Sequence, residues 1–484
     1  MRSGLMVMGL ALALTAATSG CTTTQPRSSA TPPGHTVGPI ALGVNIAAWD
    51  DIYGVTGANA ITRLLEAAGL RLIRYPGGSW ADQYDWSSDT DTAGCAFEVI
   101  SSCITYDPLT FDALSKNARA AGASTFVTVN YGSALPAEAA DWVASVKAMG
   151  KSHAVALWEV GNETYSCYET NEHLAGSPTY VKGYVPDGPV CPATSVLAKS
   201  YAVNAMPYLN AIKSVDPAAR IGVPWAFSGD EARGAGVADA AAWDSTVLGA
   251  LGGHIAFVDA HWYPFDTTTG LTDQQILSSI GRIPSAAARM RTALHRYAPG
   301  AKFVVGETNI SERLVPLDFE PVSALFAAAT SLEWLVQGAG SVDWWDLNNF
   351  GSPSTGDFGL VSSGGQEAQP AGSALPPYYG EELASRLTAT GSRLRSIATG
   401  TSTLLGFEST LGNGRRVLLV NTSPDAPSSV TPRWFGSRSD VQVETYSAAT
   451  ASTLDPVTSA TEPSELSVAL PALSIVVLSG SSRP

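Results

Sequence analysis

The stretch Val155-Ala156-Leu157-Trp158-Glu159-Val160-Gly161-Asn162-Glu163 is a short apolar run that ends in polar residues. Runs rich in Val, Ile and aromatic residues are typical of buried strands. Seven more runs of this kind occur in the chain, at residues 41–46, 70–75, 125–130, 220–225, 257–262, 302–306 and 341–347. The sequence therefore predicts eight strands between residues 41 and 347.

Ala- and Leu-rich amphipathic stretches lie between these runs, as parallel strands require of their crossover connections. They occupy residues 58–68, 111–121, 136–148, 197–214, 272–297 and 321–337. Strands alternating with helices over about 350 residues predict an α/β protein with a (β/α)₈ TIM barrel at residues 41–390.

The pattern changes after residue 390. Runs with alternating polarity at 402–408, 415–421, 441–446, 466–469 and 474–478 are separated by Ser, Pro, Gly and Asn turns. This pattern predicts a C-terminal antiparallel β-sandwich at residues 391–484. Its Leu and Val content favours a structural domain packed on the barrel over a carbohydrate-binding module.

The composition excludes several classes of protein and ligand. With 45% hydrophobic and 15% charged residues in 484, the chain is neither disordered nor a coiled coil. The net charge of −15 argues against nucleic acid, which needs a basic surface. No nucleotide-binding fingerprint or metal-binding cluster of Cys and His occurs, so the sequence predicts no cofactor and no metal.

The N-terminal residues predict export. An apolar run follows Arg2, and small residues precede Cys21, as in a secretory signal peptide with a lipobox. We expect a signal peptide at residues 1–20, lipidation of Cys21 and a flexible tether at residues 21–40. Cleavage near Ala16 without lipidation is the alternative. The expected location is extracytoplasmic, either secreted or at the cell surface, with the membrane contacted only through the lipid.

Four cysteines remain after Cys21. In an oxidising compartment we expect two disulfides, and the sequence-local pairing of Cys95 with Cys103 and Cys167 with Cys191 is the most economical of three connectivities.

Active sites of (β/α)₈ barrels lie at the carboxyl ends of the strands. Glu163 follows the fourth predicted strand, and Glu307 follows the seventh. Each glutamate alone is more often a surface or helix-terminal carboxylate. Together they suit the acid and nucleophile of glycoside hydrolysis.

Other strand ends make this pairing specific. The second strand ends in Arg74-Tyr75-Pro76-Gly77-Gly78, the third in Asn130-Tyr131-Gly132, and the sixth in His261-Trp262-Tyr263. With Asn162-Glu163 and Glu307, they resemble the retaining clan A glycoside hydrolases over residues 41–480. The second and third strands are similar to family 51 α-L-arabinofuranosidases. Gly306-Glu307-Thr308 equally resembles family 79 β-glucuronidases and heparanase-like enzymes.

This resemblance implies a two-glutamate mechanism. Glu163 would be the acid/base, with a pKa raised by apolar neighbours, and Glu307 the nucleophile, kept ionised by Arg74. Tyr263 would hydrogen-bond Glu307, and Asn162 would reach the hydroxyl next to the anomeric carbon. The predicted substrate-binding residues are Arg74, Asn130, Asn162, His261, Tyr263, Trp345, Trp225 and Trp80. For Arg74, His261 and the tryptophans, a structural role in the barrel is the alternative, and Asp82 could also contact substrate.

The sequence thus predicts a retaining glycoside hydrolase acting on poly- or oligosaccharides, with α-L-arabinofuranosidase as the first activity. A β-glycosidase, such as a β-glucuronidase, β-glucanase or xylanase, is the second. A carbohydrate-binding lipoprotein without activity is the alternative from another class. The sequence does not predict the oligomeric state.

Overall fold

The computed structural model describes residues 34–50, 52–91, 109–150, 155–167, 169–174, 192–229, 231, 237–349, 351–364, 369–432, 435, 440–453 and 455–481. Among these residues, no helix combines the length and apolarity that a membrane crossing requires. The signal peptide, Cys21, Cys95, Cys103 and Cys191 all lie outside the described residues.

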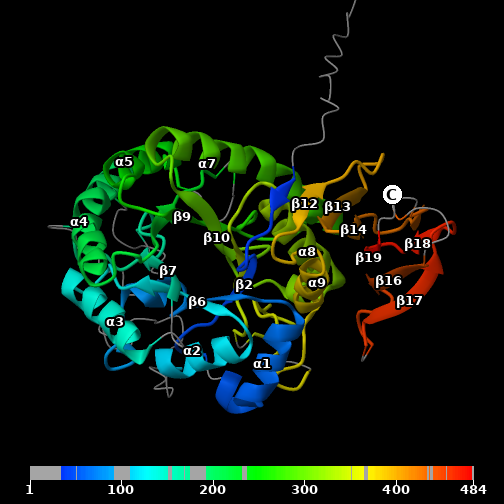
Figure 1. Ribbon diagram of the computed structural model, residues 1–484, viewed down its shortest axis with the longest axis horizontal. Coiled ribbons are helices and arrows are strands. Elements are labelled where there is room, and N and C mark those ends of the chain that lie inside the picture. The colour runs from blue at the N-terminus through cyan, green and yellow to red at the C-terminus, as the bar shows by residue number, and fades with distance from the viewer. Residues whose placement is uncertain are drawn as a thin grey trace, which may run out of the picture. The chain divides into compact units, whose positions relative to one another are not determined.

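Eight parallel strands form a closed barrel, which confirms the predicted fold class (Figure 1). Each predicted run contributes one strand, and the last strand pairs with the first to close the ring. The strands are β2 (Leu42–Asn45), β3 (Leu72–Tyr75), β6 (Ser124–Val129), β7 (Val155–Val160), β8 (Ile221–Trp225), β9 (Phe257–Trp262), β10 (Lys302–Thr308) and β11 (Val342–Trp344).

Helices surround the barrel (Figure 1). They are α1 (Ala58–Ala67), α2 (Phe111–Ala120), α3 (Pro136–Met149), α4 (Thr194–Val215), α5 (Ala240–Leu251), α6 (Asp273–Ser278), α7 (Ile283–Tyr297), α8 (Pro321–Val336) and α9 (Pro376–Ser385). Shorter elements are η1 (Tyr53–Gly57), η2 (Gly78–Asp82), η4 (Ser279–Arg282), η5 (Pro316–Phe319), and the hairpin of β4 (Tyr84–Asp85) with β5 (Thr90–Asp91).

Two helical features differ from the prediction. The single helix expected over 272–297 is divided into α6, η4 and α7, and Pro284 occupies the first turn of α7, where its missing N–H costs nothing. The sequence prediction also missed α9 and α5. In α5 the exposed positions carry Ala241, Gly249 and Ala250, so the helix has little amphipathic contrast.

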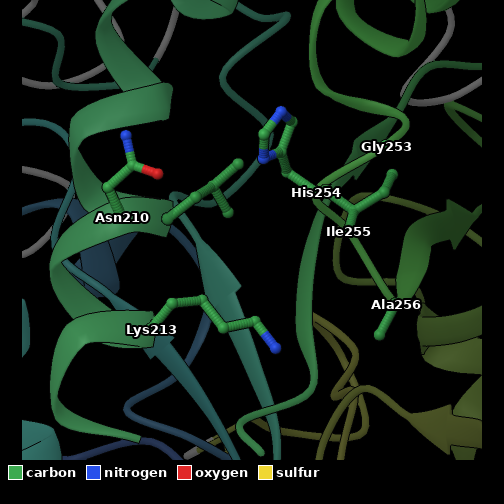
Figure 2. Close-up of a pocket in the computed structure, with 7 residues that line it drawn as sticks. Asn210, Lys213, Gly253, His254, Ile255 and Ala256 are labelled. Atoms are coloured by element: carbon green, nitrogen blue, oxygen red, sulfur yellow. The ribbon is translucent and has the colours of Figure 1, made fainter. Parts of the chain in front are cut away.

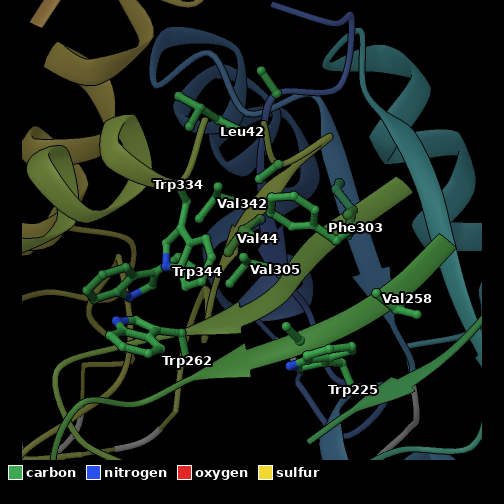
Figure 3. Packing of buried hydrophobic residues seen from close by; sticks show 14 of the residues in the cluster. Leu42, Val44, Trp225, Val258, Trp262, Phe303, Val305, Trp334, Val342 and Trp344 are labelled. Atoms are coloured by element: carbon green, nitrogen blue, oxygen red, sulfur yellow. The ribbon is translucent and has the colours of Figure 1, made fainter. Parts of the chain in front are cut away.

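Alternate strand residues face opposite sides of the barrel wall. One side packs against the helices, where Val44, Val258 and Val305 lie in one cluster with Trp262 and Trp334 (Figure 3). A separate apolar cluster, which we place inside the barrel, combines residues from five strands, and its phenylalanine rings meet edge to face at 5.6 Å. Its members are Leu72, Phe126, Leu157, Phe257 and Val304.

The C-terminal region forms an antiparallel seven-stranded sheet in the order β1-β12-β13-β14-β19-β16-β17, with a separate β15–β18 pair. Its strands are β1 (His35–Thr36), β12 (Arg393–Ser396), β13 (Leu404–Leu411), β14 (Gly414–Asn421), β15 (Ser428–Val430), β16 (Asp440–Ser447), β17 (Val457–Pro463), β18 (Val468–Leu470) and β19 (Ser474–Ser481). Because β1 pairs with β12, the expected flexible tether cannot extend to residue 40.

The central strand β14 is buried on both of its faces. In β14, Val417 and Leu419 belong to a core shared with Val468 and Leu470, whereas Leu418 and Val420 belong to the core that contains the barrel. Burial on both sides explains why this strand is a continuous apolar run rather than an alternating one. The sheet therefore packs on the barrel as a structural layer.

We predict that Leu418→Ala and Leu419→Ala each lower the free energy of unfolding by about 2–5 kcal/mol, because both side chains are fully buried. Leu411→Ala, at a side chain 52% exposed in the neighbouring strand, is the control and should have little effect. Urea unfolding followed by circular dichroism measures the three variants. A neutral result for either buried variant would contradict burial on both faces.

Candidate active site

Arg74, at the end of β3, is fully buried inside the barrel and bonds to side chains from other strands. Its Nη1 donates to Glu307 Oε1 at 2.7 Å and to Asn45 Oδ1 at 3.1 Å. Its Nη2 donates to Glu159 Oε2 at 3.0 Å and to Asn162 Oδ1 at 2.8 Å. One guanidinium thus connects β2, β7 and β10 to β3 through charge-assisted hydrogen bonds.

The strand period explains how this charged layer forms. Residues two apart in a strand point to the same side. The apolar layer inside the barrel contains Leu72, Leu157 and Phe257, and the next inward-facing residues on these strands are Arg74, Glu159 and Asp259. Asp259 lies 3.5 Å from Arg74 Nε and accepts from the Gly306 N–H at 2.6 Å. A Cβ at Gly306 would collide with that carboxylate, so this position requires glycine.

The charges in this layer depend on each other. Burial alone would lower the pKa of Arg74, but Glu159, Glu307 and Asp259 raise it, so the guanidinium is permanently charged. Burial, reinforced by Asp259, raises the pKa of Glu159 to about 8, despite the opposing charge of Arg74. The single arginine therefore does not ionise every carboxyl around it at neutral pH.

The two predicted catalytic glutamates meet at the mouth of the barrel, with His261 between them. His261 Nδ1 lies 2.8 Å from Glu163 Oε1 and 3.4 Å from Glu307 Oε2. One oxygen from each carboxylate lies within 4.8 Å of the other. Tyr165 donates to Glu163 at 2.9 Å, and Tyr263 donates to Glu307 at 2.7 Å, as the resemblance implied for Tyr263.

The pKa directions correct one expectation from the sequence. Although burial favours the neutral form of Glu163, the hydrogen bond and charge of His261 lower its pKa below the ordinary value. Burial raises the pKa of Glu307, against the influence of His261 and Arg74. The expectation that apolar neighbours raise the pKa of Glu163 is therefore wrong. The sequence could not show that His261 lies beside it.

His261 is the group that holds a proton in this pair. Burial would lower its pKa, but Glu307, Asp259 and Glu163 raise it well above the ordinary histidine value. This shift favours the imidazolium, in which Nδ1 donates toward Glu163.

The backbone around Glu163 is unusual. Glu163 has φ of 39° and Gly161 has φ of 76°, both in the left-handed region. A non-glycine residue there stores strain, which persists only where the surroundings determine the conformation. Asp82 supplies part of that constraint, since it accepts from the N–H of Asn162 at 3.0 Å and of Tyr131 at 3.3 Å. Asp82 therefore holds the loops of the site rather than being open to substrate.

The remaining predicted residues lie apart from this network. Asn130 Nδ2 donates to Tyr84 O and to Ser133 Oγ, and its Oδ1 accepts from the N–H groups of Ser133 and Ala134. These bonds fix the loop after β6. Trp225 is 1% exposed, with the Arg289 guanidinium 4.7 Å from its ring, a position that favours the structural interpretation.

The other two tryptophans are only partly buried. Trp345 packs against Gly78, and Trp80 lies in η2. Cys167 lies in the loop after β7 and is disulfide-bonded, but Cys191 lies outside the described residues, so both pairings stay predictions.

Two groups of side chains have the composition of metal ligands, namely Glu159, Asp259 and His261, and Glu163, His261 and Glu307. Both groups contain His261, and metal ligation requires a neutral imidazole. Arg74 forms an ion pair with one carboxylate of each group, Glu159 and Glu307, and Tyr263 occupies the second oxygen of Glu307.

A cavity of about 320 Å³ lies elsewhere, between α4 and the segment that leads into β9 (Figure 2). Lys213 projects toward it, but its Nζ already donates to Ala219 O at 2.7 Å and to Pro217 O at 3.1 Å. The cavity is at the amino end of β9, away from Glu163 and Glu307.

Sequence reasoning missed Asn45, Glu159, Asp259, Tyr165 and Glu169. Glu159 and Asp259 did carry a signal, because each is a carboxylate in the middle of an apolar strand, where a charge needs a partner. Glu169 lies in a loop and gave no such signal.

Comparisons with known proteins support the fold. Neither a scan of protein-family models nor a search of curated proteins finds a match. Solved structures do match. An α-L-arabinofuranosidase from Thermotoga maritima, solved with arabinose, is 15% identical with a TM-score of 0.66, over 92% of this chain and 98% of that one. A GH51 arabinofuranosidase from Xanthomonas axonopodis pv. citri is 15% identical with a TM-score of 0.64, over 93% and 97%.

A GH44 xyloglucanase from Paenibacillus polymyxa is 10% identical with a TM-score of 0.61, over 92% of this chain and 97% of that one. The chain has the fold of these enzymes. The likeness covers both the barrel and the C-terminal sheet, and at identities of 10–15% it shows the fold alone.

We predict that Arg74→Met lowers the free energy of unfolding by about 3–5 kcal/mol at pH 7, because buried carboxyls lose their cation. The folded-state pKa values of Glu159 and Glu307 then rise further, so the folded protein binds more protons than the unfolded one. Stability must therefore fall as pH rises, more steeply than in the wild type.

Urea unfolding between pH 5 and pH 8 tests this expectation. Arg313→Met is the control, because Arg313 and its partner Asp266 are 59% and 48% exposed and such pairs contribute little. Equal losses in the two variants, or a loss in Arg74→Met that is independent of pH, would contradict the role of Arg74.

Proposed function

We propose that this protein is a retaining glycoside hydrolase, with α-L-arabinofuranosidase as the first candidate for its activity. The observation that carries the proposal is the pair Glu163 and Glu307, with carboxylate oxygens within 4.8 Å at the carboxyl ends of two barrel strands. Retaining enzymes hold their carboxyls about 5–5.5 Å apart, whereas inverting enzymes leave about 6.5–9.5 Å for a water. The short separation supports the retaining mechanism.

The hydrogen-bond donors support a different role for each glutamate. Glu307 accepts from Arg74 and Tyr263, whose protons stay in place at neutral pH, so it remains a pure acceptor suited to attack the anomeric carbon. Glu163 accepts from Tyr165 and from His261, and the imidazolium is the more acidic of these two donors. A proton that moves from His261 Nδ1 to Glu163 Oε1 makes Glu163 a general acid, and no further group is needed.

A neutral sugar suits this site best. Arg74 is fully buried and engaged by three carboxylates, so it is not available to a carboxylate on the substrate. This favours an arabinofuranoside over a glucuronide. A β-glycosidase is the second candidate, because a glucanase-xylanase, CelM2, matches the fold with a TM-score of 0.64 at 15% identity, as the arabinofuranosidases do.

We also propose that the protein is exported, with cleavage of residues 1–20, lipidation of Cys21 and disulfides Cys95–Cys103 and Cys167–Cys191. The support is the apolar run before Cys21 and the disulfide-bonded state of Cys167, since such bonds persist in oxidising compartments. Mass spectrometry of the intact protein from its natural host tests the lipid and the pairing.

We predict that Glu163→Gln and Glu307→Gln each lower kcat on aryl glycosides by about 10²–10⁴-fold or more. The loss in Glu163→Gln should shrink with a dinitrophenyl leaving group, which needs no proton, whereas the loss in Glu307→Gln should not. Glu381→Gln is the control, because Glu381 is a buried glutamate that lies in α9, outside this site.

The substrate panel contains nitrophenyl α-L-arabinofuranosides, β-glucosides, β-xylosides and β-glucuronides, and NMR of the first product reports the anomer. Wild-type turnover that both glutamate variants retain would end the assignment. An inverted product would reject the retaining mechanism.

We predict that His261→Asn narrows the pH profile of kcat/KM from both sides. The active form needs a proton on the Glu163–His261 pair and an ionised Glu307. Without the imidazolium, the alkaline limit moves down to the pKa of Glu163 alone. The pKa of Glu307 rises because His261 no longer lowers it, so the acid limit moves up. A profile with unchanged limits would contradict this coupling.

A further inference from the structure

Glu169, in the loop after β7, is 4% exposed and lies beside Asn162. Its Oε1 accepts from Ser79 Oγ at 2.8 Å and from Asn162 Nδ2 at 3.2 Å. Its Oε2 is buried and has no hydrogen-bond partner within the described part of the chain. A buried carboxyl is costly, so this one calls for an explanation beyond surface charge.

The Asn162 side chain is held at both ends. Arg74 can only donate, so it contacts Oδ1, and Glu169 Oε1 accepts, so it contacts Nδ2. The two bonds fix the plane and the orientation of the amide. Only one bond uses Nδ2 in the described structure, so its second hydrogen remains for a ligand beside Glu163.

The supports of Glu169 are themselves fixed. Ser79 belongs to η2, and the loop that carries Glu169 is attached to the neighbouring loop by a bond from Glu172 N to Gly132 O at 2.8 Å. The backbone N–H of Asn162 is held separately by Asp82. Glu169 therefore acts on the side chain of Asn162, while Asp82 acts on its backbone.

We propose that Glu169 is a positioning residue that aims Asn162 Nδ2 at the hydroxyl next to the anomeric carbon. Glu169 thereby selects neutral glycosides in which that hydroxyl is free. The inference rests on the proposed glycosidase function and deepens it. A hydrogen bond at this hydroxyl strengthens in the transition state, so a misplaced Asn162 costs rate rather than binding.

Glutamine should replace Glu169 well. Burial, with Asp82 and Glu163 nearby, raises the pKa of Glu169 well above the ordinary value, which favours the neutral carboxyl. A neutral amide keeps an oxygen for Ser79 and Asn162, whereas alanine removes it.

The experiment compares kcat/KM for the best nitrophenyl glycoside with that for its 2-deoxy analogue, in wild type, Glu169→Gln, Glu169→Ala and Glu381→Ala. Glu381 is the matched control, since it is 1% exposed and accepts from one serine, Ser331, at 2.7 Å. In wild type we expect the parent glycoside to be preferred by about 10²-fold or more, the size of one transition-state hydrogen bond.

Glu169→Ala should reduce turnover of the parent glycoside by about 10–100-fold and leave the 2-deoxy analogue within about threefold, so that the preference collapses. Glu169→Gln and Glu381→Ala should keep the wild-type preference. Equal losses on both glycosides in Glu169→Ala, or no loss, would overturn the positioning role alone. A wild-type protein without activity on any glycoside of the panel would overturn the proposed function, and this inference with it.

Discussion

The buried guanidinium of Arg74 organises the centre of this protein. Arg74 has no exposed surface, and a charge in that position is tolerated only with close partners. Its partners come from β2, β7, β9 and β10, so their side chains must arrive at the same level of the barrel. The register shift between Val305 and Glu307 in β10 lies at this level. Glu307 must therefore lie at this level if Arg74 is to keep it as a carboxylate partner.

The fold could be predicted from the sequence because each barrel strand is an apolar run with a polar end, as in residues 155–163. Where a segment lacked contrast, as in α5, or contained an early proline, as in α7, the boundaries were wrong or missed. Glu163 and Glu307 were predictable because the carboxyl ends of all barrel strands converge. The charge state of Glu163 was not, because it depends on His261, which lies 98 residues away in the sequence.

The same distinction applies to the supporting residues. Asn130 and Trp225 looked equivalent to Asn162 in sequence, since all follow or end barrel strands. Only the structure shows that their contacts differ. Asn130 fixes a loop, and Trp225 lies beneath Arg289. Glu169 escaped prediction for the opposite reason, since it gains its role from a loop that folds back onto Asn162.

The pairing of β1 with β12 has a mechanical consequence. His35 and Thr36 enter the C-terminal sheet at its edge, so a segment that precedes the barrel is held by the domain that the chain completes last. Along the sequence, the barrel strands therefore lie between two segments of one sheet. A tension applied upstream of His35 would load the edge of that sheet before it reached β2. The two domains are for the same reason poor candidates for exchange as independent modules.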